Sequence, residues 1–366
     1  MEPSITNISE TNNLLAFTLK GVNVSIANGL RRVSSEIPSI VFRTSPHEAN
    51  KAVFEVNTTR MNNELIKQRL SCIPIYADVS DFPLDKYMLV VKKQNNSTSI
   101  EYVTTADFQI MNLETKQYDK ELSSKMFPPN SLTGDYTELV RLLPKVSDDI
   151  EGEQLVLTCK FDVGTTKEDS AFNITSTFVY SNTIDPAKVK AAWAAKKTEL
   201  SKTLNADEMA FAEKDWNLLD AQRHFISDSF DFKVETVGQI NNREIITRSA
   251  SIMISKLEKL KDTIQSEQGI ITTTESTIPN CFDILLKNED YTLGKVVEFV
   301  LYNTHYGNTI HYCGFRKPHP HIDESLIRIG FKSPTDKVTV STYIVNAADD
   351  LIKVYTSIGK VFEITK

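Results

Sequence analysis

Apolar residues recur with helical spacing between residues 22 and 38. They follow one another at gaps of four, four, three and four positions: Val22, Ile26, Leu30, Val33 and Ile37. This spacing places them on one buried face of a helix. Asn28, Arg31 and Arg32 lie off that face, and Pro38 ends the helix because proline has no backbone N–H to donate. The pattern predicts a helix that packs on one side and presents two guanidinium groups on another.

A strand followed by an amphipathic helix occurs twice, with a constant offset of 267 positions. Residues 17–20 of the first copy correspond to 284–287 of the second, 25–28 correspond to 292–295, and Leu30 corresponds to Val297. Each copy has an apolar face that needs a partner, so a repeat would favour an intramolecular pseudo-dimer. Chance similarity between two amphipathic units is the alternative, and the pattern alone does not separate the two.

Two longer helices accompany these copies. One is predicted over residues 243–264. The other runs from about 334 to 358, with apolar positions at gaps of three and four: Val340, Ile344, Ala347, Leu351, Val354 and Ile358. The second copy also predicts a hairpin of strands 310–316 and 326–331 around a loop of residues 317–323.

The segment between the copies has a different character. Residues 44–182 contain several short β-type runs and predict a β-rich insertion, in which strands 87–91 and 99–103 are expected to form a hairpin around the polar residues 94–96. Residues 183–224 predict two helices, 187–204 and 206–221. The lysines of the first helix most simply form a solvated face, with nucleic-acid binding as the alternative: Lys188, Lys190, Lys196 and Lys197. Residues 265–279 have the Ser-, Thr- and Glu-rich composition of a linker.

Composition narrows the class of protein. The net charge of −7 over 366 residues argues against wrapping of nucleic acid by the whole surface, although a local basic patch remains possible within a larger complex. No apolar run approaches membrane-spanning length, and the polar first ten residues do not resemble a signal peptide. The four cysteines are widely spaced, which favours free thiols in a reducing intracellular compartment.

Several motifs resemble a known family. Residues 26–32 (Ile-Ala-Asn-Gly-Leu-Arg-Arg), ending in Glu-Ile-Pro at 36–38, resemble the signature helix of the α-type assembly subunits of DNA-directed RNA polymerases. These subunits are the bacterial α subunit and the third-largest subunit of eukaryotic RNA polymerase II. Residues 64–70 with Ile-Pro at 73–74 are similar to a second motif of that subunit, and residues 229–238 resemble the strand by which its chain re-enters the dimerisation domain.

The tail resembles the small partner of that subunit. Residues 288–294 and the Cys-Gly-Phe-Arg-Lys-Pro-His-Pro run at 313–320 are similar to the eleventh subunit. The resemblance implies one chain that fuses two assembly subunits, as expected in a large DNA virus. It also implies an α+β fold in which the α-type dimerisation domain forms as an intramolecular pseudo-dimer. The implied parts are a discontinuous third-subunit-like domain (1–43 and 225–266), a β-rich insert (44–182), a helical connection (183–224), a linker (267–279) and an eleventh-subunit-like domain (280–366).

The chain departs from the family pattern at four places. Lys295 stands where the family usually has Asn, and Glu298 where it often has Arg. Gly29 stands where Ala is common, which costs a helix about 1 kcal/mol. The insert has only Cys72 in the region where many relatives carry a four-cysteine zinc loop, so that site cannot form.

One group of residues has metal-binding chemistry. Its members lie within thirteen positions: His311, Cys313, His319, His321 and Asp323. Their types suit zinc, but nothing in the sequence positions the two loop histidines, and the family motif places a Pro-His-Pro turn there without metal. No nucleophile–base pair, glycine-rich phosphate loop or clustered Asp-x-Asp motif is found, and the adjacent carboxylates at 148–149 and 349–350 do not converge on one ion. We therefore expect no catalytic residue, cofactor or bound metal in this chain.

The resemblance assigns functions to particular residues. Contacts with the large subunits are expected from Asn28, Arg31, Arg32, Glu64 and Arg69, because guanidinium groups suit carboxylates and backbone acceptors of a partner. The intramolecular dimerisation face is expected to contain Ile26, Leu30, Val33, Ile37, Leu293, Val297, Leu301 and Leu351.

The implied function is a non-catalytic assembly platform for the two largest subunits and small subunits of DNA-directed RNA polymerase (EC 2.7.7.6). DNA and RNA would be contacted only through the complex, and no membrane partner is expected. The expected location is intracellular and, for a virus, the virion and the host cytoplasm or nucleus. Two alternatives are a structural or binding module of another complex, such as a virion protein, and a zinc hydrolase that uses the region from His311 to His321.

Overall fold

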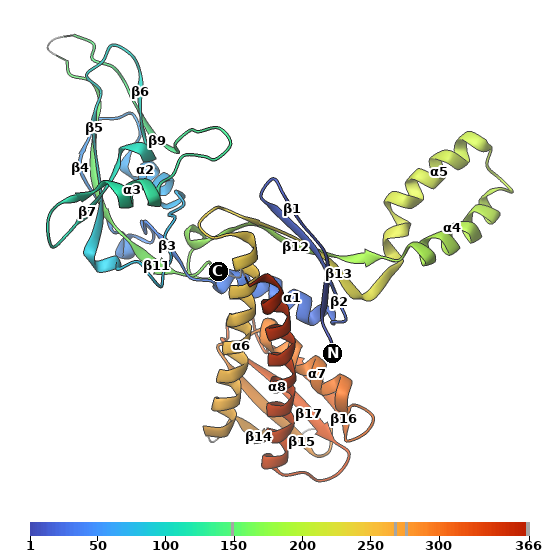
Figure 1. Ribbon diagram of the computed structural model, residues 1–366. Helices are drawn as coiled ribbons and strands as arrows, with labels where there is room; N and C mark the ends of the chain where they lie inside the picture. The colour runs from blue at the N-terminus through green and yellow to red at the C-terminus, as the bar shows by residue number, and fades with distance from the viewer. Residues whose placement is uncertain (148–149, 267–268, 275–276, 364–366) are drawn as a thin grey trace. The chain divides into compact units, whose positions relative to one another are not determined.

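Each copy of the repeat builds a four-stranded sheet in the computed structural model (Figure 1). The first sheet has the order β1 (Ser4–Thr11), β2 (Leu14–Lys20), β13 (Phe225–Thr236) and β12 (Thr175–Ile184). The second has the order β14 (Ile271–Thr273), β15 (Cys281–Lys287), β17 (Glu324–Phe331) and β16 (Ile310–Arg316). Both sheets therefore use their strands in the order first, second, fourth, third.

The structure describes residues 1–147, 150–266, 269–274 and 277–363. These divide into two compact units. Unit 1 contains residues 1–34, 177–235 and 242–366, and unit 2 contains residues 35–176 and 236–241. Within unit 1 we call the segments up to residue 266 the first half and the described residues from 269 onward the second half.

The boundaries of the repeated elements coincide at the predicted offset. Strands β2 and β15 begin and end at corresponding positions, and so do the starts of helices α1 (Val24–Val33) and α7 (Tyr291–His305). The residue before each helix caps it in the same way, because Asn23 Oδ1 accepts from the Ser25 amide at 2.9 Å and Asp290 Oδ1 accepts from the Thr292 amide at 2.8 Å. This agreement favours a true repeat over chance similarity.

The two long helices pack side by side in unit 1 (Figure 1). They are α6 (Asn242–Ser266) and α8 (Lys337–Phe362), which begin 95 positions apart and occupy corresponding places after β13 and β17. All six apolar positions predicted for the terminal helix are buried. Helix α1 packs against both α6 and α7, and α8 packs against the same two helices.

The opening helix is shorter than predicted. Val22 precedes the cap residue Asn23, and a 3₁₀ turn over Ser34–Glu36 follows Val33. The apolar spacing continued through Ile37 because a 3₁₀ turn keeps nearly the same side of the chain facing inward. Val22 and Ile37 are buried nonetheless, and Ile37 belongs to unit 2.

The described residues of unit 2 form a five-stranded sheet, two strand pairs and two α-helices. The sheet has the order β4 (Ala52–Asn57), β10 (Gln154–Lys160), β5 (Tyr87–Gln94), β7 (Phe108–Asn112) and β8 (Tyr118–Asp119). The pairs are β3 (Ser39–Val41) with β11 (Asp162–Gly164), and β6 (Glu101–Thr104) with β9 (Glu138–Leu142). The helices are α2 (Asn63–Ser71) and α3 (Lys120–Met126).

Three local predictions are corrected. The expected hairpin of residues 87–103 does not form, because β5 pairs with β10 and β7 while β6 pairs with β9. Asn95 redirects the chain there: its fully buried side chain donates to the carbonyls of Ser99 and Leu142. Strand β3, expected in the first dimerisation domain, pairs within unit 2.

The third correction concerns the linker. Residues 265–279 include the last turn of α6 and strand β14, which pairs with β15. Ile270 and Ile271 are buried, and together with the threonines after them they favour a strand despite the polar composition of the whole segment. Residues 267–268 and 275–276 lie outside the described part of the chain. The other predicted domain boundaries stay predictions.

The helical connection forms a two-helix hairpin between β12 and β13 (Figure 1). Helices α4 (Pro186–Leu200) and α5 (Ala206–Leu218) contact one another, and the rings of Trp193 and Trp216 lie 5.8 Å apart between them. Each helix ends a few residues earlier than predicted. No helix in the described ranges is long and apolar enough to cross a membrane.

Candidate subunit interface

Helices α1 and α7 cross where the two halves of unit 1 meet. Their inward residues are buried: Ile26, Leu30 and Val33 on α1, and Leu293, Val297 and Leu301 on α7. Gly29 and Val296 occupy corresponding positions of the repeat, and a Cβ on Gly29 would lie 3.3 Å from Val296 Cγ2. Contact between equivalent positions is the signature of an approximate two-fold relation, so the crossing lies near the centre of the pseudo-dimer.

Tyr355 of α8 explains the glycine at position 29. Its hydroxyl group donates to the Ile26 carbonyl at 3.4 Å and would lie 2.8 Å from a Cβ on residue 29. The side chain is fully buried, and this burial raises the pKa of the Tyr355 phenol. The space that a Cβ at position 29 would fill is therefore occupied by a buried hydroxyl group.

We expect Gly29→Ala to destabilise the protein. Alanine improves helix propensity by about 1 kcal/mol, but the crowding with Tyr355 and Val296 costs about 1–3 kcal/mol. The test compares the variant with Tyr355→Phe and with the double variant by thermal unfolding. Removal of the hydroxyl group should make the alanine neutral or stabilising, whereas an equal loss in both backgrounds would contradict this explanation.

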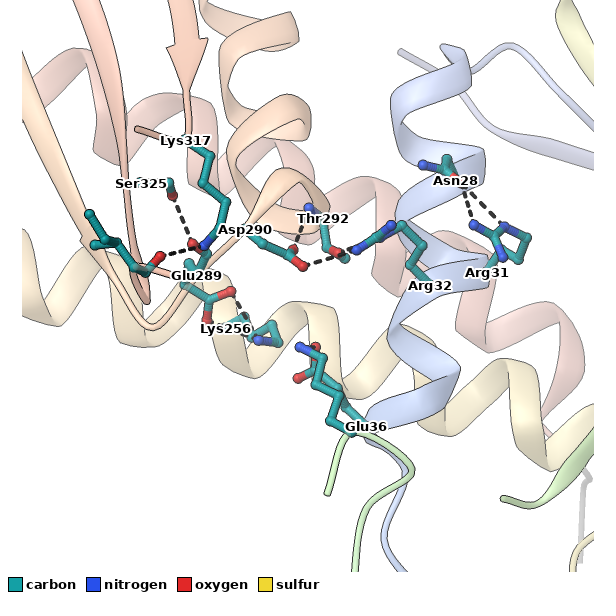
Figure 2. A network of polar contacts seen from close by, with 12 residues as sticks. Asn28, Arg31, Arg32, Glu36, Lys256, Glu289, Asp290, Thr292, Lys317 and Ser325 are labelled. Carbon is teal, nitrogen blue, oxygen red and sulfur yellow. Dashed lines mark hydrogen bonds and ion pairs between the residues drawn. The ribbon is translucent and has the colours of Figure 1, made fainter. Parts of the chain in front are cut away.

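Ion pairs connect the two halves (Figure 2). Arg32 of α1 donates from Nη2 to Asp290 Oδ2 and from Nε to Thr292 Oγ1, both at 2.9 Å. Lys256 of α6 donates to both oxygens of Glu289, at 2.9 and 3.0 Å, and these two side chains are 14% and 17% exposed. In each pair the cation belongs to the first half and the anion to the second.

A third pair follows the same rule, because Lys261 of α6 contacts Asp349 of α8. Equivalent positions of the two halves show which ion pair would be absent if two first halves, or two second halves, associated. Arg32 corresponds to Phe299 in the second half, and Asp290 corresponds to Asn23 in the first. Pairing of two first halves would place Asn23 opposite Arg32, and pairing of two second halves would place Phe299 opposite Asp290. The Arg32–Asp290 ion pair therefore favours the pairing of unlike halves.

This arrangement gives Arg32 an intrachain partner that the sequence analysis missed. Arg31 and Arg32 were treated together as residues that face another subunit. Figure 2 shows them on different sides of α1, with Arg32 toward Asp290 and Arg31 beside Asn28. The sequence does show Asp290 as the cap residue of α7. Its partner Arg32 lies 258 positions away, however, so no local pattern indicates the ion pair.

Arg31 is held on the outer side of α1. Its Nε and Nη2 atoms donate to Asn28 Oδ1, at 3.2 and 3.0 Å, and no other side-chain partner of Arg31 is found among the described residues. The same two positions of α7 carry the ion pair Lys295–Glu298, at 2.6 Å. Asn28 thus orients a guanidinium group that still has donors for a partner, while α7 presents a carboxylate at the corresponding place.

A groove of about 670 Å³ runs between the two helices. Its lining includes four aromatic side chains together with polar residues of both helices: Tyr180, Tyr291, Phe299, Tyr302, Asn28, Arg32, Lys295 and Glu298. Tyr291 is 50% exposed and Tyr302 is 45% exposed. Partly exposed aromatic residues in a concave surface with charged neighbours are typical of a protein interface. The sequence analysis identified the charged members but not the aromatic ones.

The remaining predicted contact residues lie in unit 2. Glu64 forms an ion pair with Lys67 at 2.8 Å within α2, and Arg69 Nη2 donates to the Glu138 carbonyl at 3.0 Å. Glu64 and Lys67 also line a polar groove of about 600 Å³ with Arg43. Their contacts with another subunit stay predictions.

The histidine-rich hairpin loop has poor donors for zinc. Burial raises the pKa of the Cys313 thiol to about 12, and Cys313 Sγ lies 3.8 Å from the Glu298 carbonyl, to which it donates. His319 Nδ1 accepts from the His321 amide at 3.1 Å, so this ring nitrogen is already used. Within the described ranges, no three His, Cys, Asp or Glu side chains are grouped closely enough to hold a metal ion.

Comparison with known proteins identifies the family. Residues 16–257 match the RNA polymerase Rpb3/Rpb11 dimerisation domain, and residues 281–360 match a second domain of the same description. The first match alone covers more than half of the chain. The chain belongs to the RNA polymerase Rpb3/Rpb11 dimerisation domain family.

Relatives support this assignment. The chain is 23% identical to DNA-directed RNA polymerase subunit Rpo3 of Pyrococcus horikoshii over 283 residues, which covers 72% of this chain and 98% of that protein. It is 22% identical to Rpo3 of Pyrococcus furiosus over 268 residues, 69% and 93% of the two chains. A putative DNA-directed RNA polymerase subunit, R470, of Acanthamoeba polyphaga mimivirus is 35% identical over 94 residues, which is only 24% of its own length.

These matches confirm three predictions. The fold is α+β and contains the Rpb3/Rpb11 dimerisation domain twice. The chain is a fusion of two such domains, and one of its relatives comes from a mimivirus. Membership of the family makes it a component of DNA-directed RNA polymerase whose matched parts serve subunit association.

Proposed function

We propose that this chain is a non-catalytic platform on which the two largest polymerase subunits assemble. One observation carries the proposal: both dimerisation domains are folded against each other within a single chain, and the outer side of α1 still presents Arg31, held by Asn28. A pre-formed pair removes the association step that separate subunits need. The oriented guanidinium group and the aromatic groove beside it then offer contacts to a partner.

Catalysis is assigned to the other subunits. The adjacent carboxylates Asp349 and Asp350 face different lysines, Lys261 and Lys353, and so do not form a shared ion site. The other adjacent carboxylates, at 148–149, lie outside the described residues. We propose that small polymerase subunits also bind this chain, that DNA and RNA are contacted only through the complex, and that the protein acts inside the cell.

We expect Arg31→Glu to leave the protein folded and to weaken binding of the large subunits at least about tenfold, because a carboxylate would repel the acceptors that a guanidinium group binds. The measurement is the amount of each large subunit that co-purifies with the tagged full-length chain. Lys353→Glu is the matched control, because this lysine is 75% exposed on α8 and also pairs three positions away.

The result separates the proposed function from its rival. Unchanged recovery of the large subunits with Arg31→Glu would contradict the role of this face. Recovery of capsid proteins in place of polymerase subunits, from both the unchanged chain and the control, would favour a structural module of another complex.

A further inference from the structure

Helix α5 exposes an apolar and acidic stripe on the side away from α4. Four exposed residues follow one another at gaps of four, four and three positions: Asp207, Phe211, Asp215 and Leu218. Phe211 is 73% exposed and Leu218 is 76% exposed. Successive members of such a stripe lie one helical turn apart, so the stripe runs straight along the helix for about 16 Å.

The opposite side of α5 already has a partner. Trp216 is 7% exposed and packs against Trp193 of α4, while Lys196 of α4 pairs with Asp220 at 2.9 Å and lies over the Trp216 ring. The two indole N–H groups are buried without an acceptor among the described residues. The hairpin therefore has a small core of its own, and the stripe is not needed to hold α5 on α4.

The negative charge of the stripe indicates what kind of partner would cover it. Neither Asp207 nor Asp215 forms an ion pair within the part of the chain that the structure describes, and α5 also carries Glu208 and Glu213 against the single Lys214. A partner that buries Phe211 and Leu218 brings its own side chains close to both aspartates. Those side chains must be basic, because an unpaired carboxylate is costly to desolvate.

We propose that the outer stripe of α5 binds a basic amphipathic helix of a separate protein. Such a helix would place large apolar side chains against Phe211 and Leu218, with lysine or arginine between them facing Asp215. The exposed surface of α4 in a second copy of this chain is the obvious rival, since it includes Lys190 and Lys197. The apolar side chains exposed there are mainly alanines, however, and these leave Phe211 without an apolar pocket.

The test uses two labelled helical peptides of about 18 residues, long enough to fold on binding. Both have the same leucine stripe, flanked by lysines in one and by glutamates in the other. Binding to the full-length chain is followed by fluorescence anisotropy. We expect the lysine peptide to bind at least about tenfold more tightly than the glutamate peptide, and the double variant Asp207→Lys/Asp215→Lys to reverse this order.

An uncharged substitution decides whether the stripe itself binds. The chain has a net charge of −7, so a basic peptide could be attracted to the surface as a whole. Phe211→Ser should weaken binding at least about tenfold without changing charge, whereas Lys190→Glu/Lys197→Glu on α4 should not weaken it. Equal affinity for the two peptides, or no effect of Phe211→Ser, would overturn the proposal. So would sedimentation that shows self-association abolished by Phe211→Ser, because a second copy would then be the occupant.

Discussion

Replacement of Leu351 by alanine is expected to lower the free energy of unfolding by about 2–5 kcal/mol. Leu351 is fully buried on α8, so the shorter side chain leaves a cavity in the core of unit 1. The measurement is urea unfolding followed by circular dichroism. Tryptophan fluorescence would report on the α4–α5 hairpin alone, because Trp193 and Trp216 are the only tryptophans in the sequence.

Val338 provides the control for this prediction. It lies on the same helix and is 73% exposed, so Val338→Ala should change stability by no more than about 0.5 kcal/mol. Similar effects of the two substitutions would mean that α8 does not pack as described.

Replacement of Asp290 by arginine is expected to lower the free energy of unfolding by up to about 2 kcal/mol. The change removes the cap of α7, worth about 1 kcal/mol, and places a second cation opposite Arg32. The ion pair is partly exposed, with side chains 39% and 27% accessible, so its share is about 1 kcal/mol or less. The same urea unfolding measurement gives the total loss in free energy of unfolding.

Two further variants separate the effect of the charge at position 290 from the effect of losing the helix cap. Asn23→Arg removes the corresponding cap of α1, where the repeat places Phe299 rather than a cation opposite, and should cost only about 1 kcal/mol. Arg32→Asp combined with Asp290→Arg restores the attraction and should recover part of the loss. If the double variant is as unstable as the sum of the single ones, the charges do not select unlike halves.

The repeat was accessible from sequence because its signal is local. A strand of seven residues, a short link and a capped helix recur at one offset, and each part follows from apolar spacing and the cap residue. The buried residues of α8 were predictable for the same reason, since a helix face is defined by gaps of three and four.

Features that depend on distant partners could not be predicted. The charge of Arg32 was visible, but whether it meets Asp290 or another subunit depends on how α1 and α7 cross. The pairing of β5 depends on which strands flank it, so the polar turn after it indicated a hairpin that does not exist. The aromatic groove combines residues of α1, α7, β12 and β16 and has no signature in any one segment.

Gly29 shows both the use and the limit of the family pattern. Comparison with the expected alanine singled out the position and predicted only a cost in helix propensity. The structure shows what offsets this cost, because the buried Tyr355 hydroxyl group occupies the space of the missing methyl group.

The most direct test of the account is reconstitution of the two largest subunits with and without this chain. Mass photometry at equal concentrations measures how much of each large subunit is in a shared complex. We predict one complex that contains both large subunits and this chain, and little association of the large subunits in its absence. Equal association with and without the chain would contradict the assembly role.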